Sequence, residues 1–74
     1  MDVTIELSGQ LLPGRPRSQT LKLEHTMTVQ GVALLLGLEP EEVGLIAMNG
    51  VQSEMDDPVP PDARLCFFPH LSGG

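Results

Sequence analysis

Thr28-Val29-Gln30-Gly31-Val32-Ala33-Leu34-Leu35-Leu36-Gly37 is the stretch that decides the fold class, because it is the clearest helical segment in the sequence. Apolar residues recur in it at spacings of three and four, which predicts a helix with one buried stripe. The Thr28 hydroxyl can accept a hydrogen bond from an early helical amide, and Gly37 suits the left-handed position that ends a helix. The residues expected on the stripe are Val29, Val32, Ala33, Leu35 and Leu36.

Two strands are expected before this helix. The alternation of Val3, Ile5 and Leu7 with polar residues predicts a strand with one buried face. A second alternation, of Leu21 and Leu23 with Thr20, Lys22 and Glu24, predicts its partner. The segment between them, residues 8–18, is rich in glycine and proline and should form the long loop of an antiparallel hairpin, with Arg15 and Arg17 exposed.

The segment after the helix predicts two or three further strands. Residues 39–42 are expected to form a surface connection or a single helical turn. Ile46 and Met48 then alternate with Ala47, and Asn49-Gly50 is typical of a tight hairpin turn from which Val51-Gln52 returns as a short strand. The last strand is expected over residues 64–68, with Leu65 and Phe67 on one face and Cys66 and Phe68 on the other.

This order of elements predicts an α+β fold. A single helix that covers one face of a mixed four- to five-stranded sheet buries both apolar surfaces economically. With the last strand parallel to the first, the arrangement is the β-grasp fold of ubiquitin. We expect one domain over residues 1–69 and a flexible di-glycine tail over residues 70–74.

Composition excludes several classes of function. The 74 residues carry ten acidic and four basic side chains, a net charge of −6, and no Lys or Arg lies between Glu39 and Asp62. Such a surface disfavours nucleic-acid binding; it serves either solubility or encounter with a basic groove on a protein partner. The single Cys66 excludes an internal disulfide and favours the cytoplasm. No run approaches the roughly 20 apolar residues of a membrane span.

Side chains that could carry catalysis are scarce. The sequence has no serine nucleophile motif, no phosphate loop and no pair of Cys-x-x-Cys ligands. Alternation places Cys66 in the middle of a strand, where an inert, buried or half-buried thiol is expected. His25 and His70 lack an evident third ligand, so we expect no metal site. The acids Glu54, Asp56 and Asp57 fit either a weak cation site or a solvated turn, and their spacing does not match a calcium loop.

The end of the chain offers different chemistry. Beyond Pro69, the five residues His70-Leu71-Ser72-Gly73-Gly74 can reach roughly 17 Å from the domain. Two glycines let such an arm pass through a narrow channel. Its carboxylate would become reactive as a mixed anhydride with AMP. A frayed terminus is the alternative, but an apolar Leu71 on an exposed tail indicates a docking partner.

Several motifs resemble the MoaD/ThiS family of ubiquitin-like sulfur carriers. These are Val-x-Ile-x-Leu at the start, the Thr28-Val29 helix opening, Ile46-Ala47-Met48-Asn49-Gly50, and the run from Arg64 to Gly74. The approach Phe67-Phe68-Pro69 to Gly73-Gly74 is most similar to the small subunit of molybdopterin synthase. His70 departs from that group, where a second proline is common.

The resemblance implies a carrier rather than an enzyme, with no bound cofactor. A ubiquitin-activating-type adenylyltransferase would adenylate Gly74 with ATP and magnesium, and a persulfide sulfur donor would convert it to a thiocarboxylate for the large subunit of molybdopterin synthase. Thiamine-type sulfur transfer, attachment to proteins through Gly74 and a plain β-grasp interaction module are the alternatives. The implied site comprises Gly74 as the reactive residue, Gly73 and Ser72 in the tail, and Leu71, Phe68 and His70 for partner binding.

Overall fold

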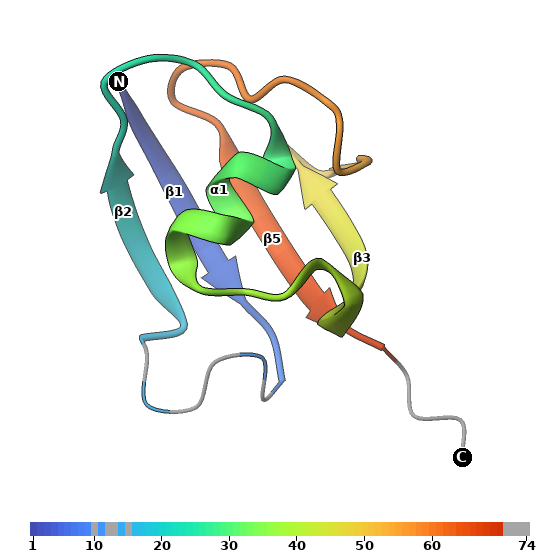
Figure 1. Cartoon of the computed structure of the whole chain (residues 1–74). Helices are drawn as coiled ribbons and strands as arrows, with labels where there is room; N and C mark the ends of the chain where they lie inside the picture. Colours follow the sequence, from blue (N-terminus) through green and yellow to red (C-terminus); the bar gives the residue numbers. More distant parts are fainter. Residues whose placement is uncertain (10, 12–13, 15, 71–74) are drawn as a thin grey trace.

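The computed structural model describes residues 1–9, 11, 14 and 16–70, which form a five-stranded sheet with one α-helix across one face (Figure 1). The expected four to five strands are therefore five. In chain order the elements are β1 (Asp2–Leu7), β2 (Ser18–Lys22), α1 (Val29–Leu36), the 3₁₀ helix η1 (Pro40–Glu42), β3 (Val43–Met48), β4 (Val51–Gln52) and β5 (Arg64–Pro69).

The sheet has the order β2-β1-β5-β3-β4, so the last strand lies at its centre. β5 runs parallel to β1 and antiparallel to β3, as Figure 1 shows. The predicted hairpin is confirmed, because β1 and β2 pair antiparallel from Asp2 opposite Lys22 to Glu6 opposite Ser18. Arg17 is exposed as expected, whereas Arg15 lies outside the described residues.

The core lies between α1 and the face of the sheet that it covers. Strand alternation turns every second residue of β1 and β5 toward the helix, and these side chains are almost completely buried. The polar or half-buried residues between them lie on the opposite face, called the outer face below. The buried residues of these three elements are Val3, Ile5, Leu7, Val29, Val32, Ala33, Leu36, Leu65 and Phe67.

The helix has the predicted ends but a narrower buried stripe. The Thr28 hydroxyl accepts a hydrogen bond from the Gly31 amide at 3.2 Å, and Gly37 closes the helix with φ of 85°. The prediction for Leu35 was wrong, because that side chain is 60% exposed while Leu36 is 1% exposed. At 3.6 residues per turn, position 35 lies about 110° from the centre of the stripe. No helix in the described part of the chain has the length and apolarity to cross a bilayer.

Strand boundaries differ modestly from the expectation. β2 begins at Ser18, earlier than the alternation of Leu21 and Leu23 suggested, because pairing with β1 rather than hydrophobic alternation sets its extent. β5 continues through Pro69, which pairs with Val43 although proline cannot donate to the ladder.

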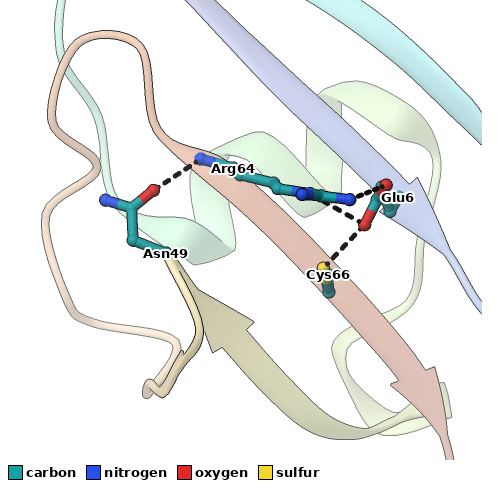
Figure 2. Close-up of polar contacts among 4 residues, drawn as sticks. All are labelled: Glu6, Asn49, Arg64 and Cys66. Carbon is teal, nitrogen blue, oxygen red and sulfur yellow. Dashed lines mark hydrogen bonds and ion pairs between the residues drawn. The ribbon is translucent and has the colours of Figure 1, made fainter.

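The predicted turn at Asn49-Gly50 is present. Both residues have positive φ, 53° and 82°, which matches the twist of a tight hairpin. The Asn49 side-chain oxygen also accepts a hydrogen bond from the Arg64 amide at 2.9 Å, which joins this turn to the start of β5 (Figure 2). One turn thus aligns β4 with β3 and also fixes the start of the central strand.

Candidate functional site

The predicted site begins where β5 ends, with Phe68 in that strand and His70 directly after it. Because β5 is held between β1 and β3, its final residues leave the sheet from the middle rather than from an edge. Phe68 is half-buried and pairs with Leu45 of β3, and His70 is exposed. The remaining predicted site residues, Leu71, Ser72, Gly73 and Gly74, lie outside the described residues.

Two glycines surround the backbone at this exit. A Cβ atom on Gly44 would lie 2.8 Å from both the His70 Cα and the Pro69 carbonyl oxygen, closer than side chains tolerate. A Cβ on Gly9 would lie 2.9 Å from Cγ of the Pro69 ring, and Gly9 has φ of 66°. Pro69 is therefore packed between the β1–β2 loop and β3, and the register irregularity between Val43 and Leu45 surrounds the same glycine.

His70 makes a specific contact with η1. Its Nε2 lies 2.7 Å from the carbonyl oxygen of Glu41. A carbonyl oxygen only accepts, so Nε2 carries the proton and donates. The structure thus gives this side chain an intramolecular contact, and the partner binding predicted from the sequence stays a prediction.

A shallow apolar groove adjoins the exit. It has a volume of about 400 Å³ and is lined by Gly44, Leu45, Phe68, Pro69 and His70. Leu45 is 43% exposed, although it lies within a strand. Residues 68–70 thus form one wall of a groove that could receive an apolar side chain from another protein.

The outer face also carries a polar cluster, shown in Figure 2. Arg64 contacts both carboxylate oxygens of Glu6, with its Nε at 3.0 Å and a terminal nitrogen at 2.6 Å, and the Cys66 thiol donates to Glu6 at 3.1 Å. The parallel pairing of β1 with β5 places Glu6 opposite Cys66 and thereby brings the three side chains together.

These contacts set the protonation of the cluster. The hydrogen bond from Arg64, then that from Cys66, lowers the pKa of Glu6. Burial, then the bond to Glu6, raises the pKa of the Cys66 thiol. A thiol is a poor nucleophile until it ionises, so this geometry agrees with the inert role expected for Cys66.

The acidic turn is organised by its own hydrogen bonds. Asp57 accepts from the Ser53 hydroxyl at 2.7 Å and from the Glu54 amide at 2.9 Å. The Glu54 amide, then the Ser53 hydroxyl, lowers the pKa of Asp57. No group of three potential metal ligands occurs among residues 1–9, 11, 14 and 16–70. The hydrogen bonds of Asp57 show that residues 53–57 form an ordered turn.

Sequence reasoning missed several contributors to the site, among them Gly44 and Glu6. Gly44 escaped notice because it lies in a strand, although an isolated glycine there often marks close backbone approach. Glu6 looked like an ordinary outward-facing strand residue, because its partners Arg64 and Cys66 are 58 and 60 positions away.

Comparison with known proteins identifies the architecture. No protein-family profile and no curated protein matches the sequence. Among solved structures, SAMP1 from Haloferax volcanii superposes with a TM-score of 0.73 at 20% identity, over 100% of both chains. Urm1 from Trypanosoma brucei superposes with a TM-score of 0.63 at 20% identity, over 99% of this chain and 95% of that one. With its central parallel β5 and single covering helix, the chain adopts the β-grasp fold of ubiquitin.

Proposed function

We propose that this protein is a ubiquitin-like sulfur carrier whose Gly74 carboxylate is adenylated and then converted to a thiocarboxylate. The observation that supports it most is the run of the central strand of a β-grasp sheet directly into His70 and the sequence Leu71-Ser72-Gly73-Gly74. The fold similarity to SAMP1 and Urm1 supports a scaffold of this kind. In this proposal the chain is a carrier rather than an enzyme and binds no cofactor itself.

The chemistry requires partner enzymes at each step. A ubiquitin-activating-type adenylyltransferase joins the Gly74 carboxylate to AMP from Mg-ATP and releases pyrophosphate. The outer sulfur of a persulfide donor attacks the acyl carbon, and AMP leaves. A thiol then cleaves the resulting acyl disulfide, which leaves a thiocarboxylate on Gly74. Gly73 and Ser72 supply a slim approach, because a chain without bulky side chains can enter a narrow active site.

The finer proposal is that the sulfur goes to a pterin. The approach Phe67-Phe68-Pro69 to the di-glycine end supports a small subunit of molybdopterin synthase, with the tail entering the large subunit. There the thiocarboxylate sulfur would attack the pterin precursor to build the dithiolene. Purified thiocarboxylated protein, mixed with a large subunit and precursor, should return to the carboxylate as the dithiolene forms.

The groove beside the exit is the proposed docking surface. Phe68 and Leu45 offer apolar contact area next to the tail, and Leu71 follows in the sequence. Central apolar anchors commonly dominate protein interfaces, and truncating one typically costs more than about 1 kcal/mol of binding. Phe68→Ala should therefore weaken binding to the activating enzyme about tenfold, whereas Leu35→Ala, which removes an exposed leucine from the helix side, should not.

The main test follows the mass of the intact chain. Incubation with an adenylyltransferase, Mg-ATP and a persulfide donor should replace one terminal oxygen by sulfur, and tandem mass spectrometry should place the change on Gly74. A variant lacking Gly74 should keep its NMR fingerprint and remain unmodified. An unchanged mass with an activating enzyme that works on its own carrier would contradict the proposal, and Gly74 isopeptide adducts on lysines in cell extracts would instead indicate a protein modifier.

A further inference from the structure

We propose that His70 is a positioning residue that holds the root of the di-glycine tail in one direction relative to the sheet. The inference rests on the proposed function, because orientation matters only if a partner enzyme captures the tail. It assigns to His70 a role in presenting the tail, beyond the partner contact expected from its place in the sequence.

The contact that carries this inference is the bond from His70 Nε2 to the Glu41 carbonyl oxygen, 2.7 Å long. Glu41 belongs to η1, which precedes β3 directly, so the bond links the residue after β5 to the segment before β3. The acceptor is a backbone atom of a short helix whose own end is fixed by the bond from the Val43 amide to the Pro40 carbonyl. The bond therefore connects His70, the first residue of the tail, to the folded domain.

The backbone around His70 allows only a narrow choice of paths. The His70 Cα and nitrogen lie 2.8 and 2.9 Å from the place a Cβ on Gly44 would occupy, so the tail root lies directly over β3. Pro69 is confined on its other side by Gly9. Packing thus fixes the position of the His70 backbone over β3, and the bond from its ring holds the side chain against η1.

The strength of a single hydrogen bond is suited to a contact that holds His70 in the free protein and that a partner can break. A net contribution of one hydrogen bond changes a two-state population about 2- to 10-fold. The bond is strong enough to favour one orientation of His70 and weak enough for a partner enzyme to break it. If a partner enzyme binds only the bonded orientation of His70, its apparent affinity falls in proportion to the fraction of molecules in that orientation.

The test compares His70→Ala with His70→Gln, because a glutamine amide keeps a donor near the position of Nε2. His25→Ala is the matched control: His25 is also exposed, and its Nδ1 lies 3.2 Å from the carbonyl oxygen of its neighbour Thr26 rather than of a distant residue. Backbone ¹⁵N relaxation of residue 70 should give an order parameter of about 0.85 in the native protein and in His25→Ala, and below about 0.6 in His70→Ala. The order parameter of residue 70 in His70→Gln should return most of the way to the native value. The order parameters of β5 should be the same in every variant.

Kinetics then separate positioning from chemistry. His70→Ala should raise the KM of the adenylyltransferase for the carrier about 2- to 10-fold with unchanged kcat, and His70→Gln should restore it. Equal order parameters in the native protein and His70→Ala would overturn the inference, as would a His70→Gln variant no better than His70→Ala. If the native chain is not adenylated at all, the proposed function fails. The order parameters of residue 70 then still decide whether the His70 bond restricts its motion.

Discussion

Glu6 shows how one carboxylate organises the outer face of the sheet. It accepts from Arg64 on the neighbouring strand through both oxygens and from the Cys66 thiol (Figure 2). The ion pair is solvent-exposed, so its contribution to stability is small and screened by salt. Its clearer effect is on protonation, because a carboxylate with a lowered pKa makes stability depend on pH.

The unfolding free energy should therefore fall as the solution is acidified. The folded-state pKa of Glu6 is lowered, so its contribution is present above the pH at which an unfolded glutamate titrates, roughly 4.3, and is lost as the pH falls through the folded-state value. Urea denaturation from neutral to acidic pH should show the gap between native protein and Glu6→Gln narrowing as the pH falls. A gap that stays constant would show that the contacts of Glu6 do not depend on its ionisation.

In helix α1, tertiary packing rather than residue type decides how much each side chain contributes to stability. Three consecutive leucines close it, and only Leu36 enters the core, whereas Leu34 and Leu35 are 59% and 60% exposed. The helix is eight residues long, too short to be stable alone in water, so its stability comes from this packed face.

Truncation of adjacent leucines should separate these roles. Leu36→Ala should lower the unfolding free energy by about 2–5 kcal/mol, because it leaves a cavity against the sheet. Leu35→Ala, the matched control one residue earlier, should change it by less than about 0.5 kcal/mol. Guanidinium denaturation of both variants provides the measurement. Similar losses in the two would mean that Leu35 is buried in solution, in disagreement with the structure.

At the scale of the whole molecule, the central position of β5 holds the two halves of the sheet together. This strand arrives last in the sequence but bonds to both β1 and β3, so it joins the N-terminal hairpin to the β3–β4 pair. His70 therefore directly follows the strand that is paired on both sides (Figure 1). A firm base of this kind suits the proposed presentation of Gly74 to partner enzymes.

Hydrogen exchange should reveal the same hierarchy. Ladder amides of β5 and β1 are expected to exchange slowest, with opening free energies near that of global unfolding, because opening them breaks the centre of the sheet. The two-residue edge strand β4, both of whose residues are exposed, should exchange much faster. Amide exchange followed by NMR at constant pH tests this order, and equal protection of β4 and β5 would contradict it.

Much of the fold could be predicted from local patterns. The Thr28 cap and Gly37 bounded the helix, alternation identified β1 and β5, and Asn49-Gly50 marked its turn, because each signal depends on neighbouring residues alone. The β-grasp arrangement followed from the order of elements and the need to cover one sheet face. The tail residues that carry the proposed chemistry were also evident in the sequence, since their chemistry lies in the backbone.

Only the tertiary structure decided which groups meet. The contact of Gly44 with the Pro69–His70 backbone, the bond from His70 to Glu41 and the cluster of Glu6 with Arg64 and Cys66 join residues 25 to 60 positions apart. Local propensity carries no information about such distances, because strand register and the path of the chain set them. The sequence by itself determined a β-grasp domain followed by a di-glycine motif, and long-range pairing decided how Pro69 and His70, the last described residues, are held.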